Sequence, residues 1–276
     1  MDTTKNKNAW MIEGSSKSRL VSVTPDAEAT MAYVARVTSK DQENPDFKRL
    51  LKYCIKHGHW SVMEQAYMTV EVITPLAIAV QLLRHRSFTM QQYSGRYEDQ
   101  SFMHEYTEDL PAFMEMFYIP EEARLQDTKN RQNSIVAEDG ALTDFMWAEF
   151  EFAYKACAQS YKNLLDKGIA KEIARFVLPE GVYTRLYVTG SCRSWIHYLS
   201  VRDDAGVAQH EHCELARCVK PIFANVFPTV YDTIEWVKPP VVNIEATVKE
   251  LEETKKELST IKSLLSKLFS LFNPEK

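Results

Sequence analysis

Apolar residues recur at helical spacing in some stretches of the chain and alternate with polar residues in others. The helical spacing predicts helices at 25–37, 47–57, 75–86, 141–167, 169–178, 191–201 and 208–224. Runs rich in β-branched and aromatic residues predict strands at 20–23, 67–73 and 183–188. Helices and strands are therefore interspersed along the chain, with no internal repeat.

Residues that start and stop helices support these boundaries. Thr24 is a suitable cap for the first helix, and Pro25 suits its first turn. Gly58 follows the second helix, where a left-handed residue commonly ends one. Thr74 and Pro75 mark the start of a helix that we expect to run into residues 84–86.

The pattern changes after Pro239 and Pro240. Apolar residues then recur every seven positions, at Leu251, Leu258, Leu265 and Phe272. This spacing predicts an amphipathic C-terminal helix, so we divide the chain into a domain at 1–240 and an extension at 241–276. The helix makes a contact between subunits, folds back on its own domain or adheres to a membrane surface, and the sequence leaves these alternatives open.

Composition limits the class of protein. The 276 residues are 45% hydrophobic and 11% aromatic, enough for a large buried core. The net charge of -5 argues against binding nucleic acid through its backbone, so we expect a small-molecule partner. No apolar run approaches the roughly 20 residues of a membrane span, and we expect neither a signal peptide nor a membrane anchor. Five cysteines without a CxxC pair fit the reducing cytoplasm.

The segment 84–97 concentrates the residues best suited to chemistry. Helical spacing places Gln81, Arg84 and His85 on one side of a helix end, and alternation then places Gln92, Ser94 and Arg96 on one face of an extended segment. Guanidinium groups offer paired donors to phosphate or carboxylate, which predicts an anionic, hydrogen-bonding ligand. The alternative is that Arg and His in a last helical turn only complement the helix dipole.

The same segment resembles the signature of the flavin-dependent thymidylate synthases. Arg-His-Arg at 84–86 is followed by seven residues, then by Ser94 and the pair at 96–97. Segments 57–64, 174–179, 191–197 and 208–211 are similar to other elements of that family, in the same order, so the resemblance extends over about residues 20–235. The chain departs from many relatives at Val62 and Met63, where they carry Pro-Phe, and at Ser191, where they carry Asn.

The resemblance implies a fold, a reaction and a set of ligands. The fold is α+β, with a central, mostly antiparallel sheet flanked by helices and a C-terminal helical extension. The reaction makes dTMP from dUMP, with 5,10-methylenetetrahydrofolate as carbon donor, FAD as hydride carrier and NADPH as reductant. The family assembles as homotetramers whose active sites lie between subunits.

The resemblance also implies roles for individual residues. It assigns dUMP binding to Gln81, Arg84, Gln92, Tyr93, Ser94, Gly95, Arg96 and Arg175, the last from a neighbouring subunit. It assigns FAD binding to His59, Ser61, Arg84, His85, Arg86, Gln92, Ser191, Arg193 and His197. Arg202 occupies the position of the arginine that polarises the uracil, and we expect it to be the catalytic residue.

The chemistry of methylating uracil is consistent with these roles. No cysteine lies in the Pro-Cys-Gln setting of the other class of thymidylate synthase, so C5 of uracil must be activated without a thiolate. Arg202 facing the pyrimidine edge would stabilise negative charge developing on N3 and O4. Ser94 is the rival nucleophile, but it needs an adjacent base, and we assign it to dUMP binding.

Three other functions compete with this assignment. The run at 210–213 contains two histidines, a glutamate and a cysteine, but on a helix their side chains point in different directions, so we expect no metal. A nucleotide- or RNA-binding protein would use Arg84, Arg86 and Arg96 to hold phosphates. A flavoprotein that has lost methyl transfer is the last possibility.

Overall fold

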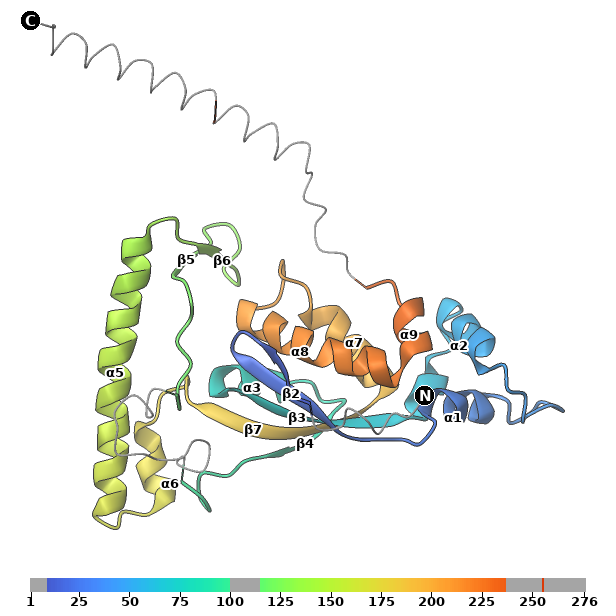
Figure 1. The fold of residues 1–276 in the computed structure, drawn as a ribbon, viewed down its shortest axis with the longest axis horizontal. Helices are drawn as coiled ribbons and strands as arrows, with labels where there is room; N and C mark the ends of the chain where they lie inside the picture. The colour runs from blue at the N-terminus through green and yellow to red at the C-terminus, as the bar shows by residue number, and fades with distance from the viewer. Residues whose placement is uncertain (1–8, 100–114, 237–254, 256–276) are drawn as a thin grey trace, which may run out of the picture. The chain divides into compact units, whose positions relative to one another are not determined.

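The computed structural model describes residues 9–99, 115–236 and Lys255 (Figure 1). Its centre is a five-stranded sheet in the order β1-β2-β3-β7-β4, in which all neighbouring strands are antiparallel. The strands are β1 (Met11–Glu13), β2 (Ser16–Val23), β3 (Tyr67–Pro75), β7 (Tyr183–Ser191) and β4 (Thr89–Gln92). A separate hairpin joins β5 (Arg124–Gln126) to β6 (Ser134–Val136). The predicted α+β fold with a mostly antiparallel sheet is confirmed.

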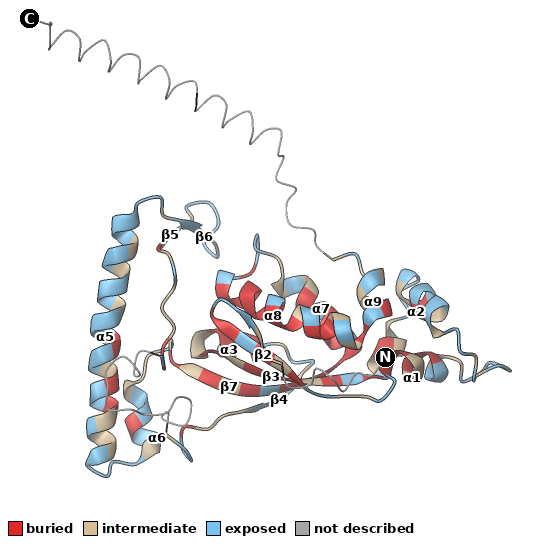
Figure 2. Cartoon of the chain, in the orientation of Figure 1, coloured by how far each residue is buried: buried red, intermediate tan, exposed pale blue. Residues whose placement is uncertain are grey.

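Two helices, α7 (Cys192–Arg202) and α8 (His210–Val226), lie over one face of the sheet (Figure 1). Alternate residues of the central strands point toward them, so Val70, Val72, Leu186 and Val188 are all buried. Figure 2 shows the buried residues along the sides where sheet and helices meet. Burial of these apolar side chains is the main force that fixes α7, and with it Arg202, over the sheet.

Shorter helices complete the two ends of this layer. Helices α1 (Ala27–Ala35), α2 (Phe47–Lys56) and α9 (Pro228–Thr233) pack together with the 3-10 turn η2 (Trp60–Glu64). The long helix α5 (Gly140–Asp166) instead packs on α6 (Lys171–Ala174) and the 3-10 turn η4 (Arg175–Val177). A second small core, around Phe117 and Tyr154, fixes α5 near the start of β7.

Two local predictions around the signature segment were wrong. The predicted helix 75–86 is the shorter α3 (Leu76–Leu82), because the backbone N–H groups of Arg84 and His85 bond to carbonyls three residues back and tighten the chain into turns. The extended segment stops at Gln92, since Tyr97 N–H bonds to the carbonyl of Ser94 and closes a turn there. Residues 94–96 therefore do not continue the alternation of β4.

Other elements agree with the sequence or extend it. The helix at 47–57 is α2, and Gly58 after it has a φ of +70°, the left-handed conformation that glycine adopts without strain. Strands β1, β5 and β6 are three residues long and were not predicted. No helix in the described part of the chain is long and apolar enough to cross a membrane. The predicted C-terminal helix at 241–276 lies outside the described residues, apart from Lys255.

Candidate active site

His85 and Arg202 join the signature segment to the end of α7. Nε of Arg202 donates a 2.9 Å hydrogen bond to Nε2 of His85. The His85 ring also meets the Tyr198 ring edge to face, with centroids 5.1 Å apart. Burial, followed by the charges of Arg202 and His197, lowers the pKa of His85 to about 4. His85 is therefore neutral at pH 7, and its ring accepts from the guanidinium.

Gln92 ends β4, and Ser94 and Arg96, also predicted to bind the substrate, lie after it near α6. Nε2 of Gln92 donates to Oγ1 of Thr184 on β7 at 3.3 Å. The Gln92 and Thr184 side chains therefore lie on the same side of the sheet. The turn after β4 places the backbone N–H of Arg96 3.4 Å from Oγ of Ser94. Nε of Arg96 lies 3.4 Å from Oε2 of Glu172, an exposed ion pair that brings Arg96 beside the helix preceding Arg175.

Two further predicted substrate residues belong to the same turn region. Tyr93 donates its backbone N–H to the carbonyl of Arg185, and its hydroxyl donates to the carbonyl of Asp99. Burial, followed by nearby tyrosine and carboxylate groups, raises the pKa of Tyr93 well above its ordinary value, so the hydroxyl stays protonated. Gly95 lies within this turn.

A cavity of about 1070 Å³ is lined mainly by residues of α2, η2, α7 and α9. Its lining includes Arg193 and His197, both predicted to bind FAD, and Ser87, which follows the Arg-His-Arg run. The cavity is large enough for a dinucleotide-sized ligand, since ligand pockets commonly span about 300–1,000 Å³. His59 and Ser61 flank Trp60, another lining residue, and both are exposed.

Sequence reasoning missed part of this lining. Lys52 and Lys56 reach the cavity from one face of α2, and Trp60 and Ile196 provide apolar surface. The i, i+4 spacing of the two lysines was visible in the sequence, but such a charged face is usually only solvated. Ammonium groups and an aromatic ring that line one cavity suit a ligand with both phosphates and a ring system, so the residues present fit FAD.

Glu64 fixes the start of α7 at the edge of the cavity. Its Oε2 accepts from Oγ of Ser191 at 2.9 Å, and its Oε1 accepts from Nη1 of Arg193 at 3.1 Å. Oγ of Ser191 also caps α7 by accepting from the N–H of Ser194 at 3.2 Å. Ser191 thus has a structural role, whatever it contributes to a ligand.

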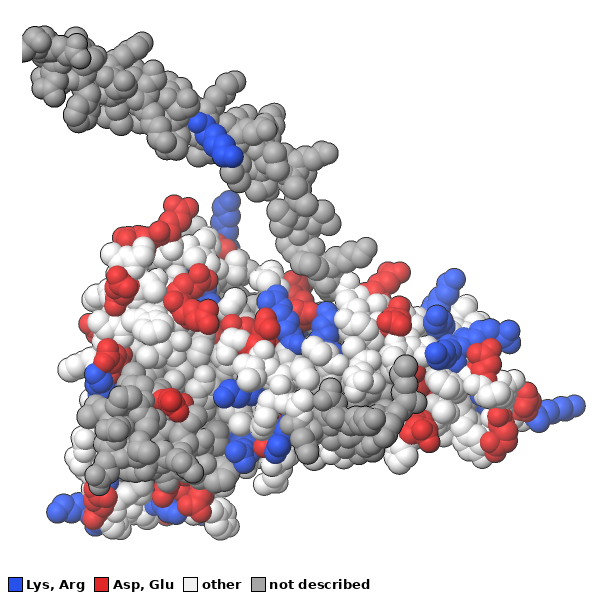
Figure 3. Space-filling view, in the orientation of Figure 1, with Lys and Arg blue, Asp and Glu red and all other residues white. Residues whose placement is uncertain are grey.

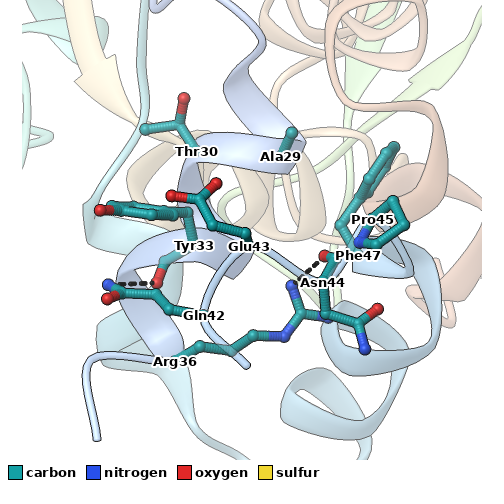
Figure 4. A pocket seen from close by; sticks show the side chains of 9 residues that line it. All are labelled: Ala29, Thr30, Tyr33, Arg36, Gln42, Glu43, Asn44, Pro45 and Phe47. Carbon is teal, nitrogen blue, oxygen red and sulfur yellow. Dashed lines mark hydrogen bonds between the residues drawn. The ribbon is translucent and has the colours of Figure 1, made fainter. Parts of the chain in front are cut away.

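A second hollow, of about 290 Å³, lies between α1 and α2 (Figure 4). Nη1 and Nη2 of Arg36 donate to the carbonyls of Asn44 and Asp46 at 2.7 and 2.6 Å. Nε2 of Gln42 donates to the carbonyl of Tyr33 at 3.2 Å. These bonds hold the loop between the two helices, so we interpret the polar groups of this hollow as structural.

The fold and the cavity thus define an α+β protein with a site suited to phosphorylated small molecules. The family model described as thymidylate synthase complementing protein matches residues 19–229. A flavin-dependent thymidylate synthase from Synechocystis is 46% identical over 209 residues, which are 76% of this chain and 90% of that protein. A probable flavin-dependent thymidylate synthase from Paramecium bursaria Chlorella virus 1 is 42% identical, over 80% of this chain and 99% of its own length.

A solved structure has a similar fold. It is a UMP/dUMP methylase from Streptomyces cacaoi bound with 5-Br dUMP, and it matches with a TM-score of 0.65 and 25% identity over 80% of this chain and 95% of its own. The chain belongs to the family of flavin-dependent thymidylate synthases.

Proposed function

We propose that this protein catalyses the reductive methylation of dUMP to dTMP, with 5,10-methylenetetrahydrofolate as carbon donor and tetrahydrofolate as the second product. Family membership supports the reaction, and the observation that carries it to this chain is the bond between Arg202 and His85. It joins the Arg-His-Arg run at 84–86 to the arginine expected to act on the uracil. FAD, reduced by NADPH, supplies the hydride.

The cavity beside α7 is the proposed FAD site. The residues that would hold FAD are His59, Ser61, Arg84, His85, Arg86, Gln92, Ser191, Arg193 and His197. Arg193 and His197 line the cavity, and Lys52 and Lys56 add positive charge for the pyrophosphate. Trp60 offers an aromatic surface to a ring of the ligand.

The region around β4 is the proposed dUMP site. The residues that would bind dUMP are Gln81, Arg84, Gln92, Tyr93, Ser94, Gly95, Arg96 and Arg175. The guanidinium groups among them suit the phosphate. Arg202 would donate to the pyrimidine edge and stabilise the negative charge that develops on N3 and O4. His85 orients this guanidinium by accepting from Nε.

The bonding of His85 supports a binding role for Ser94 over a nucleophilic one. A serine nucleophile needs a base within hydrogen-bonding reach. Nε2 of His85 already accepts from Arg202, and in the neutral tautomer Nδ1 carries the proton. His85 therefore has no free basic nitrogen for the Ser94 hydroxyl.

We also propose a homotetramer whose active sites lie between subunits. Large apolar side chains project from α5 and the segment after it: Phe145 is 64% exposed, Phe152 is 76% exposed and Phe176 is 78% exposed. Figure 2 shows that most of α5 is exposed. Such apolar surface is typical of protein interfaces. Arg175 precedes Phe176 directly, so an interface here would carry Arg175 to a neighbouring site.

Subunit mixing tests this arrangement. Arg175→Ala and Arg202→Ala variants, each strongly impaired alone, should regain part of the dTMP synthesis when mixed and allowed to exchange subunits, because some sites then contain both arginines. The matched control mixes Arg202→Ala with Arg96→Ala, two residues expected to serve the same subunit's site. Failure of the first mixture to gain activity, with exchange demonstrated, would contradict sites shared between subunits.

The distribution of surface charge and the state of the cysteines indicate which partners and which cell compartment to expect. Figure 3 shows acidic and basic side chains interspersed on the face drawn, which gives little reason to expect a nucleic-acid partner. All five cysteines are free thiols, and four of them are buried. Free thiols suit a reducing compartment, so we propose that the protein works in the cytoplasm, on small molecules and away from membranes.

The flavin spectrum of the purified protein tests the proposed cofactor. We expect bound flavin, and loss of most of it in Arg193→Ala. Lys171→Ala, which changes a lysine that contacts Tyr97 and Glu98 outside the cavity, is the control. A protein that binds no FAD, even when FAD is added, would contradict the assignment.

A further inference from the structure

A chain of hydrogen bonds runs through the start of α8 to Gln81. Nε2 of Gln209 donates to Oε2 of Glu211 at 2.8 Å, and Nε2 of Gln81 donates to Oε1 of Gln209 at 2.6 Å. Oε1 of Gln81 lies 3.2 Å from Nδ1 of His212. Glu211 and His212 are 2% and 0% exposed, so the two ends of this chain are shielded from water, whereas Gln209 between them is exposed.

Glu211 is held as a carboxylate at one end of this chain. Arg124 forms an ion pair with its Oε1, and the Tyr118 hydroxyl donates to the same atom at 3.3 Å. Burial by itself would raise the pKa of Glu211, but the hydrogen bonds from Arg124, the backbone and Gln209 outweigh burial and leave the pKa below its ordinary value. An ionised carboxylate only accepts hydrogen bonds.

The carboxylate therefore sets the direction of every bond that follows. Gln209 must turn its NH₂ toward Glu211, which leaves its carbonyl to accept from Gln81. Gln81 must then turn its own carbonyl toward His212. Reversing Gln81 would bring two carbonyl oxygens face to face, and reversing Gln209 would turn its carbonyl toward the carboxylate and its NH₂ toward that of Gln81. His212 consequently carries its proton on Nδ1 and donates.

His212 is suited to this task because it stays neutral. Burial, followed by the charges of Arg202 and His85, lowers the pKa of His212 to about 3. Its ring meets that of His85 edge to face, with centroids 6.1 Å apart, and lies 5.8 Å from that of Tyr198. Nε2 of His212 has no hydrogen-bond partner among the described residues, as expected for the unprotonated nitrogen of the Nδ1–H tautomer.

We propose that Glu211, Gln209 and His212 are positioning residues that clamp the Gln81 amide from both sides. The clamp fixes which atom of Gln81 faces each neighbour, and leaves the amide one N–H and one lone pair for a ligand. A fixed donor and acceptor suits the polar groups of a nucleotide. This inference rests on the proposed function, in which Gln81 contacts dUMP.

The tautomer of His212 is the direct test of the clamp. ¹⁵N-histidine NMR distinguishes a protonated Nδ1 from a protonated Nε2, and the His212 signal is assigned by its loss in His212→Leu. We expect the Nδ1–H form in the wild-type protein. In Glu211→Gln, where the side chain can both donate and accept, we expect a mixture of tautomers. A wild-type His212 with the proton on Nε2 would overturn the direction of the chain.

A double-mutant cycle tests the effect on substrate binding. We expect His212→Leu to weaken dUMP binding by about tenfold, as for the loss of one hydrogen bond, and kcat to change less than KM. His212→Gln retains an N–H donor and should restore most of the affinity. Because the clamp acts through Gln81, His212→Leu should add little to the loss already caused by Gln81→Leu.

The outcomes separate the clamp from the proposed function. Calorimetry with dUMP measures affinity without requiring turnover, and the melting temperature of each variant reports general destabilisation. Additive losses in the cycle, with normal dUMP binding by the wild type, would overturn the clamp alone. A folded wild-type protein that binds no dUMP would overturn the proposed function, and the positioning role with it.

Discussion

The Nε–H of Arg202 points at Nε2 of His85 across 2.9 Å, although the two residues are 117 positions apart in the sequence. The bond requires an unprotonated His85 nitrogen, and the lowered pKa of His85, about 4, provides it. Arg202 ends α7, and His85 follows α3, so the bond depends on how both helices pack against the sheet. The proposed catalytic arginine is thus oriented by the signature segment itself.

Removing the Arg202 side chain should affect turnover far more than binding. We expect Arg202→Ala to bind dUMP within a few-fold of the wild type, while kcat falls by about 10²-fold or more, the scale for one lost donor to a developing charge. Arg202→Lys keeps the charge but not the planar donors, and should recover only part of the loss. Steady-state assays of dTMP formation measure both, and near-normal turnover in Arg202→Ala would remove Arg202 from the mechanism.

The two neutral histidines should make stability depend on pH. Their folded-state pKa values, about 4 for His85 and about 3 for His212, lie below the ordinary value of 6.5. Between these limits the unfolded chain binds more protons than the folded one, so the free energy of unfolding decreases as pH falls from about 6.5 to 4. The urea midpoint measured across this range should fall more steeply for the wild type than for His212→Leu. Equal slopes would contradict the assignment of His212 as a buried neutral group.

Gly190, which contacts Phe88 of the signature segment, should be required for packing. A Cβ on Gly190 would lie 2.4 Å from Cδ1 of Phe88, which is itself packed against Trp195 at a centroid distance of 4.5 Å. Gly190→Ala should therefore lower the free energy of unfolding by about 1–3 kcal/mol. Gly140→Ala, where a Cβ meets nothing within 4 Å, is the control and should be nearly neutral. Equal stability of both variants in denaturant unfolding would contradict this account.

The C-terminal extension is expected to be dispensable for the reaction. The residues proposed for dUMP and FAD all lie before Pro239, so deleting residues 241–276 should leave turnover and the tetramer intact. Sizing chromatography and a dTMP assay on the truncated protein measure both. A truncated protein that runs as a dimer or monomer would show instead that the extension makes a subunit contact.

Local sequence patterns predicted much of this fold, because many helix and strand boundaries depend on residues that are close together in the sequence. The limits of α2 and α5 and the central strand β3 follow from periodicity and from Gly58. The end of α3 does not, because it depends on turns that let β4 pair with β7. The short β1 is fixed mainly by pairing with β2, and its own sequence carries little strand signal.

In the candidate active site, too, the sequence predicted local features but not contacts between distant residues. The signature segment identified Arg84 to Arg96 as candidates, but partners distant in sequence were not visible. Glu211 belonged to a segment that resembles the family, and Glu211 and His212 to a possible metal run, but neither observation gave their partners. In the structure Glu211 bonds to Arg124, 87 residues away, and His212 to Gln81. Lys52 and Trp60 joined the candidate cavity only once α2 and η2 were packed beside α7.

Formation of dTMP from dUMP directly tests the proposed reaction. Purified protein is incubated with dUMP, 5,10-methylenetetrahydrofolate and NADPH, with and without added FAD, and the nucleotides are separated and quantified. We expect dTMP that requires the flavin and disappears when either dUMP or the folate is left out. A folded, FAD-loaded protein that oxidises NADPH and produces no dTMP would contradict it.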